Sequence, residues 1–366
     1  MTKDKFYEQQ TDLTATKIKF YQEYIGGYLI KVLMTFGTCF IADLFCGQGK
    51  NADKDGSPLV LINAAKKMLE SPTLKKIQPS ATVEILFNDV DTNNIGNLKA
   101  ELTKATIPSG IKLSQPTSKT FSAILSDLSQ KLTNKTPKFF FLDPFTYSDV
   151  QISEIKKIID SPYSEVLLFL PTFLAYRFAG VKTEPKTEIF LQNFTTRGIA
   201  TYTDIQDFND SIREKLMQSL GLEFVRPILL DGGRSKNTLF FLTKHIKGML
   251  LMNKLVWDNS IDGKSVKVDS DASLPLFAKS EIDTTTQNYT SFAKKLEDEL
   301  KNRKQMKNTE VVKFTAIHGL LPAHARTILK NLGNKITVSY LGKGKQGFYV
   351  SDTNCDVEMS VIKYNA

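Results

Sequence analysis

Apolar runs alternate with helical segments over the first 256 residues. Five short runs are rich in large apolar side chains, at 38–45, 82–89, 137–144, 164–172 and 237–245. Continuous apolar runs of this length are typical of strands that are covered on both faces. Apolar positions recur with helical spacing between them, at 57–71, 92–105, 118–132 and 148–160. This alternation predicts an α/β fold with a doubly wound, mostly parallel sheet.

The stretch 24–42 is apolar enough to be compared with a membrane span, but it carries Lys31 near its centre. A lysine at the centre of a span costs about 2.5–3.5 kcal/mol. The pattern instead predicts an amphipathic helix over about 13–34, ended by Gly37, and then a buried strand over 38–42. The polar N-terminus does not resemble a signal peptide. We therefore expect a cytoplasmic protein without a membrane span.

A different pattern follows residue 308. It predicts one helix at 309–321 and a second at 322–333. A strand at 336–341, a turn at 342–347 and a returning strand at 348–352 follow. Two helices joined by a short turn and followed by a hairpin are typical of a winged helix-turn-helix. We therefore expect three regions: an α/β domain over 1–256, a linker with a helix over 257–308, and a winged-helix-like domain over 309–366.

The positive charge of the chain is concentrated in this tail. The formal net charge is +9, and the segment 301–350 holds ten basic residues against one acid, Glu310. Such an excess creates a field that attracts phosphates. Arg326 and Lys330 share one face of the expected second helix, and Lys343 and Lys345 lie in the expected wing. These four residues predict contact with DNA or RNA, and the alternative is a packing or protein–protein module with a solvated basic surface.

Cysteine and histidine are too sparse for a disulfide framework or a zinc site. The chain has three of each, at Cys39, Cys46, Cys355, His245, His318 and His324. All three histidines lie in the last third of the chain, so His and Cys cannot assemble a metal site in the first 240 residues. We expect no metal, and Cys46 lacks a neighbouring histidine in the sequence that could activate it as a nucleophile.

The first strand end with chemical signals is the segment 41–49, IADLFCGQG. It matches neither the GxxxxGK[ST] phosphate loop nor the full GxGxxG fingerprint. The form D-x-F-x-G-x-G resembles motif I of S-adenosylmethionine (SAM)-dependent methyltransferases. The resemblance implies a cofactor site made by Asp43, Phe45, Gly47 and Gly49, with Asp43 near the ammonium group of SAM. A tight strand-to-helix turn without a ligand is the alternative.

The second strand end is FNDVD, at 87–91. In doubly wound folds, an acid at the end of the second strand accepts hydrogen bonds from ribose hydroxyls. Asp89 is our candidate and Asp91 the second choice. An aspartate after a strand also caps helices, and Asp91 is placed to cap a helix that begins near Thr92.

The third strand end is FLDPF, at 141–145. It resembles motif IV of amino-group methyltransferases, in which an acid and a proline carbonyl accept hydrogen bonds from the target amine. The resemblance implies these roles for Asp143 and Pro144, and stacking of an aromatic ring on a flipped base for Phe145 or Tyr147. Phe145 stands where the motif has a second proline, and Thr146 where it has the aromatic residue. Methylation of cytosine C5 is disfavoured because no cysteine follows a proline.

Together, four segments resemble the three-Cys-motif partner proteins: TKIKFYQEYI (16–25), DLFCGQG (43–49), GSPLVL (56–61) and FFLDPF (140–145). The likeness extends over about 12–257. It implies a class I SAM-dependent methyltransferase-like fold, often with a helix-turn-helix-like tail, and a separate partner protein that bears three cysteines.

Two hypotheses of different classes follow. The first is a SAM-dependent methyltransferase that acts on nucleic acid, at an exocyclic base amine. The second is a non-catalytic SAM-fold component that binds nucleic acid or senses a nucleotide within a multi-protein bacterial system, in defence or RNA processing. An NAD-dependent oxidoreductase is disfavoured by the incomplete glycine fingerprint and by the lack of histidine in the first 240 residues.

Overall fold

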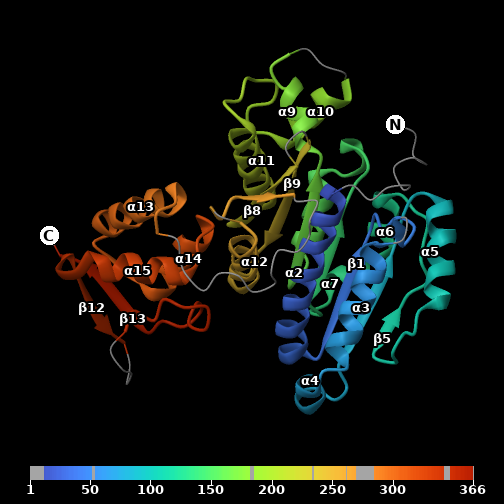
Figure 1. The fold of residues 1–366 in the computed structure, drawn as a ribbon, viewed down its shortest axis with the longest axis horizontal. Coiled ribbons are helices and arrows are strands. Elements are labelled where there is room, and N and C mark those ends of the chain that lie inside the picture. The colour runs from blue at the N-terminus through green and yellow to red at the C-terminus, as the bar shows by residue number, and fades with distance from the viewer. Residues whose placement is uncertain are drawn as a thin grey trace. The chain divides into compact units, whose positions relative to one another are not determined.

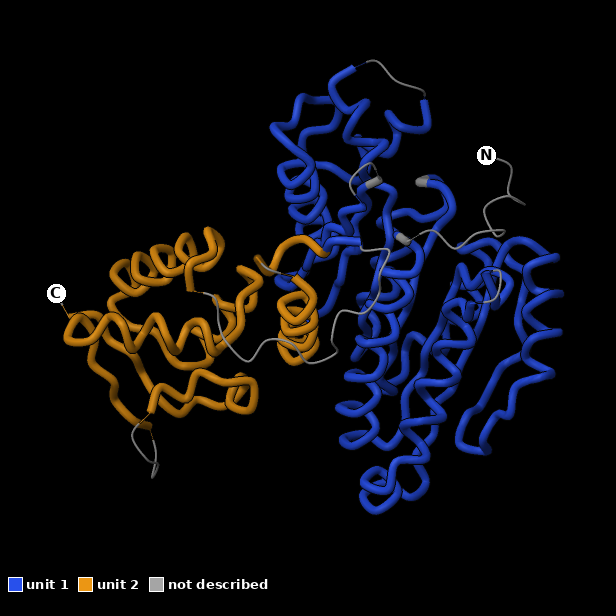
Figure 2. Tube along the Cα trace, viewed as in Figure 1, with its two compact units in different colours: residues 1–244, 267–270 blue, residues 245–266, 271–366 orange. Residues whose placement is uncertain are grey.

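The structure is a computed structural model, and it describes residues 12–51, 54–181, 185–232, 235–260, 262–268, 284–341 and 347–365. The chain forms two compact units (Figure 2). The first comprises Met1–Lys244 and Lys267–Ser270, and the second His245–Val266 and Asp271–Ala366.

A large, mostly parallel sheet forms the centre of the first unit (Figure 1). Its strands are β1 (Thr38–Asp43), β4 (Thr82–Phe87), β5 (Ile111–Leu113), β6 (Lys138–Leu142), β7 (Ser164–Leu170), β8 (Phe224–Gly232) and β9 (Ser235–Thr243). Of the short β10 (Ser265–Lys267), Lys267 belongs to this unit. The order of the strands is β10-β8-β9-β7-β6-β1-β4-β5. The pairs from β5 to β7 are parallel, whereas β9 is antiparallel to both β7 and β8. The predicted α/β fold with a mostly parallel sheet is confirmed.

Helices connect and cover these strands. They are α2 (Asp12–Phe36), α3 (Ser57–Leu69), α4 (Pro72–Ile77), α5 (Thr92–Lys104), α6 (Phe121–Asp127), α7 (Ser129–Thr133), η1 (Tyr147–Asp149), α8 (Ile152–Ile159), α9 (Thr172–Phe178), α10 (Pro185–Phe194) and α11 (Ile205–Leu220). A small hairpin, β2 (Lys50–Asn51) and β3 (Lys54–Asp55), follows β1. The expected helix over 118–132 is divided into α6 and α7 by Leu128, which caps both.

Strand β6 shows why the sheet is covered on both faces. Successive side chains of a strand point to opposite faces. Phe139 and Phe141 face α2, where Phe141 stacks on Tyr21 with 4.5 Å between ring centroids. Phe140 joins the apolar core on the other face, which also contains buried residues of α8 and α11. A run of apolar residues therefore has buried contacts at every position.

The stretch 24–42 folds as two elements. Helix α2 ends at Phe36, Gly37 follows with φ +69°, and β1 begins at Thr38. A left-handed residue favours glycine and ends a helix. The predicted helix–glycine–strand arrangement is confirmed, and among the described residues no helix combines the length and apolarity needed to cross a bilayer.

The second unit is built from helices and a three-stranded antiparallel sheet. Its elements are α12 (Ile246–Asp258), α13 (Gln287–Arg303), β11 (Gln305–Lys307), α14 (Asn308–Ile317), α15 (Pro322–Leu332), η2 (Gly333–Lys335), β12 (Ile336–Tyr340) and β13 (Ser360–Tyr364). The strand order is β11-β13-β12. The two expected helices are present as α14 and α15.

The prediction of a returning strand at 348–352 is wrong, because the strand that pairs with β12 is β13, at Ser360–Tyr364. The Asn308 side chain explains the difference. Its amide N–H groups donate to the carbonyls of Tyr349, Asn354 and Val357 at 2.9–3.3 Å, so they hold this segment as a loop. Tyr349 also has φ +55°, which a strand does not allow.

The division between the units falls after Lys244, whereas the sequence placed a boundary at 256. Helix α12 belongs to the second unit because its polar groups bond there. The Asn253 amide donates to the carbonyls of Ala316 and Leu320, and Trp257 Nε1 donates to the carbonyl of Gly319 at 2.8 Å. The helix expected within 257–308 is α13, and it is part of the same unit.

Candidate cofactor and acceptor site

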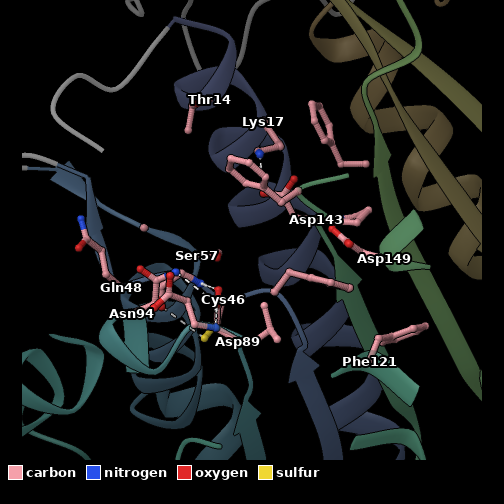
Figure 3. Close-up of a pocket in the computed structure, with 18 of the residues that line it drawn as sticks. Thr14, Lys17, Cys46, Gln48, Ser57, Asp89, Asn94, Phe121, Asp143 and Asp149 are labelled. Carbon is pink, nitrogen blue, oxygen red and sulfur yellow. Dashed lines mark hydrogen bonds and ion pairs between the residues drawn. The ribbon is translucent and has the colours of Figure 1, made fainter. Parts of the chain in front are cut away.

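A cavity of about 790 Å³ lies at the carboxyl ends of the central strands (Figure 3). The register explains its position, because β1 pairs Asp43 with Phe87 of β4 on one side and with Phe141 of β6 on the other. Asp89 and Asp143 each follow two residues beyond these partners. The chain leaves β1 for β4 and later returns to β6, so the cavity lies where the strand order reverses, which is where ligands bind in such sheets.

The glycine loop forms one wall of the cavity. Gly47 and Gly49 line it, with φ of +64° and +86°. A Cβ on Gly49 would lie 2.9 Å from the Leu98 side chain, and a Cβ on Gly56 would lie 2.9 Å from the backbone oxygen of Gly49. Glycines therefore keep the loop close to its neighbours and leave backbone exposed to the cavity.

Asp89 also lines the cavity and fixes this loop. Its Oδ2 accepts a hydrogen bond from the backbone N–H of Gly47 at 2.9 Å. Its Oδ1 accepts from the N–H of Asp91 at 2.8 Å and from the Asn94 amide at 3.2 Å. Asp91 also lines the cavity, but its side chain caps α5, where it accepts from the N–H of Asn93. The sequence left open which of the two acids has which role. In the structure Asp89 binds the glycine loop and Asp91 caps α5.

Asp43 lies beneath the wall of the cavity and does not line it. The side chain is fully buried, and within the described residues neither carboxylate oxygen has a hydrogen-bond partner of good geometry. Burial raises the pKa of Asp43 to about 7; the Ser57 hydroxyl and the backbone of Phe45 act against this shift, and the charges of Asp143 and Asp89 add to it. Ser57, which sequence reasoning did not single out, lines the cavity.

Phe45 and Cys46 of the glycine loop lie in apolar surroundings. Phe45 lines the cavity and packs against Phe121, with 5.6 Å between ring centroids. Cys46 is buried, and burial raises the pKa of its thiol well above the usual value. A thiol that stays protonated is a poor nucleophile.

The acceptor side of the cavity contains an ion pair that the sequence did not suggest. Lys17 Nζ lies 2.5 Å from Oδ2 of Asp143, and the Lys17 side chain is 7% exposed. The same Nζ lies 4.3 Å from the centre of the Phe169 ring. Both charged residues line the cavity and point toward each other (Figure 3). The position of Lys17 in the sequence could have indicated its burial, because Lys17, Tyr21 and Tyr24 share one helix face. Both tyrosines are fully buried.

Pro144 and Phe145 also line the cavity. Phe145 is 52% exposed, so about half of its surface is accessible to solvent. Tyr147 begins η1, but its side chain lies outside the described part of the chain. Thr146 and Asp149 form a capping box, in which Asp149 accepts from both the N–H and the hydroxyl of Thr146.

The candidate phosphate contacts lie in the second unit. Arg326 and Lys330 are exposed on α15, and Arg326 also donates to the carbonyl of Val350 at 3.0 Å. Lys343 and Lys345 lie outside the described residues. Four other basic residues of the tail form ion pairs with acids, namely Lys301, Arg303, Lys307 and Lys335. The charge available for phosphates is therefore smaller than the sequence count.

Across the described ranges, no group of three or more His, Cys, Asp or Glu side chains is placed to hold a metal ion.

The comparisons with known proteins find structural similarity only. No protein-family model and no curated protein matches the sequence. Among solved structures, the DszA carbon methyltransferase aligns with a TM-score of 0.33 and 10% identity, over 61% of this chain and 54% of its own. An SAH-bound methyltransferase from Podospora anserina aligns with a TM-score of 0.30 and 12% identity, over 58% of this chain and 76% of its own.

A third structure is a modification subunit of a putative type I restriction enzyme from Vibrio vulnificus. Its TM-score is 0.31 at 9% identity, over 61% of this chain and 44% of its own. The chain thus spans about half the length of two of these three proteins. Similarity at this level assigns no residue roles, and the resemblance to the three-Cys-motif partner family stays a prediction.

Proposed function

We propose that this chain is a SAM-dependent methyltransferase that acts on nucleic acid. The observation that carries the proposal is the convergence of three separate strand ends on one cavity. Gly47 and Gly49, Asp89, and Asp143 come from three strands and line the same space. The fold alone would not assign this activity.

The residues around the cavity fit SAM. Gly47, Gly49 and Ser57 offer a close backbone surface and a hydroxyl to its amino-acid part, and Asp89 offers carboxylate oxygens to its ribose. Asp43 is a buried carboxyl that does not line the cavity, and its ionised form would favour a positive charge there. When bound, SAM supplies a methyl group on a positively charged sulfur, and the protein orients and desolvates the reactants.

The sheet favours this proposal over a dinucleotide-dependent oxidoreductase. The six-stranded Rossmann sheet is parallel in the order 3-2-1-4-5-6. In this chain the order of the first five strands is the same, but β9 is antiparallel and lies between β7 and β8.

Motif resemblance suggests an exocyclic base amine as the acceptor. Oδ1 of Asp143 and the carbonyl of Pro144 would accept its hydrogens, and the exposed ring of Phe145 would stack on the base. Base–aromatic stacking is worth about 1–3 kcal/mol per base.

The second unit supports a nucleic-acid substrate. We propose that it is a winged-helix domain, because its elements run helix, strand, helix, helix and two strands, from α13 to β13. In such domains the second helix of the helix-turn-helix enters the major groove. Here that helix is α15, with Arg326 and Lys330 exposed.

Two measurements on the full chain test the proposal. Calorimetry with SAM and with S-adenosylhomocysteine should show binding of both. Transfer of a labelled methyl group to DNA or RNA should be seen, and Asp143→Ala should abolish it while S-adenosylhomocysteine still binds. Failure to bind either compound would refute the proposal. Binding without transfer would favour the non-catalytic alternative.

A further inference from the structure

The ion pair of Lys17 with Asp143 bears on which atom receives the methyl group. Removing a lysine ammonium from water is costly unless a partner compensates. Lys17 comes from α2, and Asp143 follows β6, so two distant segments bring this pair together at the cavity. Unlike the buried Lys138, whose ammonium donates to three backbone carbonyls away from the cavity, Lys17 lines the cavity.

The amine acceptor that motif resemblance suggests would give the Lys17 ammonium no part in the reaction. A neutral amine is activated by groups that accept its hydrogens, such as a carboxylate and a carbonyl. The Lys17 ammonium has only donors and no acceptor. Its contact at 2.5 Å also occupies Oδ2 of Asp143, so only Oδ1 is left for an amine.

A hydroxyl acceptor would give Lys17 a part in the reaction. A hydroxyl is a weak nucleophile until a base takes its proton. Lysine serves as a general base in enzymes, and Lys17 lines the cavity in which the acceptor would bind. Asp143 would then orient the Lys17 amine and stabilise the ammonium that the reaction regenerates.

We propose that Lys17 is the catalytic base for methylation of a hydroxyl oxygen, with Asp143 positioning it. This inference rests on the proposed SAM-dependent function. The hydroxyl oxygen forms a bond to the methyl carbon as the methyl–sulfur bond breaks, and that electron pair stays on sulfur. The hydroxyl proton passes to the Lys17 amine and later to water. The products are a methyl ether and the neutral thioether S-adenosylhomocysteine, so charge and atoms balance.

The proposal also names the nucleic acid. An internal nucleotide of DNA has no free hydroxyl, whereas each internal nucleotide of RNA has a 2′-hydroxyl. If the acceptor is an oxygen on a polynucleotide chain, the substrate class is therefore RNA. We expect the Phe145 ring, which is 52% exposed, to stack on a base of the same or the neighbouring nucleotide.

The experiment uses the full chain, SAM with a labelled methyl group, and random-sequence synthetic RNA and DNA oligonucleotides. The products are digested to nucleosides, and the position of the label is identified. We expect label in 2′-O-methyl nucleosides from RNA and none from DNA. Label on a base nitrogen would overturn this inference and leave the proposed methyltransferase intact. Absence of label from both polymers would overturn the inference, and failure to bind S-adenosylhomocysteine would in addition overturn the proposed function.

Two variants separate a catalytic from a structural role for Lys17. We expect Lys17→Met to lower the transfer rate by about 10²–10⁴-fold, the usual contribution of a general base. Its affinity for S-adenosylhomocysteine, measured by calorimetry, should stay within about twofold. Lys17→Arg keeps the ion pair, but arginine does not release its proton, so it should not restore the rate. Recovery of the rate with arginine would show a structural pair and refute the proposal.

Lys19→Met is the matched control on the same helix. Lys19 is partly exposed and lies 4.0 Å from Glu23, and it does not line the cavity. Its transfer rate should equal that of the wild type. Thermal unfolding of all variants shows whether a lost rate reflects a lost fold, and the affinity for S-adenosylhomocysteine gives a second readout that does not depend on turnover.

Discussion

The backbone N–H of Gly47 donates a hydrogen bond to Oδ2 of Asp89 at 2.9 Å. This bond joins the loop after β1 to the end of β4, so one side chain both shapes the glycine loop and faces the cavity (Figure 3). The other oxygen of Asp89 is held by Asp91 and Asn94. Both carboxylate oxygens of Asp89 therefore accept hydrogen bonds. A side-chain amide has only one oxygen, so it cannot accept all of them.

Asp89→Asn should weaken binding of S-adenosylhomocysteine by about tenfold or more. The NH₂ of the new amide would face a donor, either the N–H of Gly47 or the N–H groups of Asp91 and Asn94, so at least one hydrogen bond would be lost. A hydrogen bond to a charged group is worth about 1.5–3 kcal/mol. Calorimetry measures the change. Asp91→Asn is the control, because asparagine caps a helix as well as aspartate does. Equal losses in both variants would contradict the role given to Asp89.

Much of the fold follows from local pattern. The left-handed conformation of Gly37 divides an apolar stretch into α2 and β1, and this depends on neighbouring residues alone. The three strand-end motifs meet because parallel strands share one carboxyl edge. Strand β8 was not among the predicted strands; it contains Pro227, which lacks the N–H that a ladder needs.

Contacts between distant segments could not be predicted in this way. Lys17 is one charge on an otherwise apolar helix face, and only the packing of α2 against the sheet places it beside Asp143. The segment around Val350 has the composition of a strand, but Asn308, far away in the sequence, binds its carbonyls and holds it as a loop. Local patterns do not contain this information.

Glu165 should make stability depend on pH. Burial raises the pKa of Glu165 from its ordinary 4.5 to about 7, although hydrogen bonds from Tyr24 and Thr243 act against this shift. The folded state therefore holds a proton that the unfolded chain releases, so the free energy of unfolding should fall as pH rises from about 4.5 to 7 and then level off. The two pKa values differ by an amount equivalent to roughly 3 kcal/mol.

Glu165→Gln should remove this share of the pH dependence, and urea unfolding at pH 5 and pH 8 measures it. The loss between the two pH values should be smaller in the variant than in the wild type. The burial of Asp43 gives a shift of the same direction, so some pH dependence should remain. Glu84→Gln is the control, because Glu84 is partly exposed and paired with Lys131. An unchanged dependence in Glu165→Gln would refute the assignment.

Lys330→Ala should weaken binding of the full chain to nucleic acid and make it less sensitive to salt. Each phosphate that a lysine neutralises adds about 0.7–0.9 to the slope of log affinity against log salt concentration, so the slope should fall by about that amount. Lys301→Ala is the matched control, since Lys301 already lies 3.2 Å from Glu297 and has less charge to offer a phosphate. Titration of a labelled RNA oligonucleotide at several salt concentrations measures both slopes. If Lys301→Ala lowers the slope as much as Lys330→Ala, the positive field of the tail acts as a whole, and the exposed face of α15 is not the phosphate-binding surface.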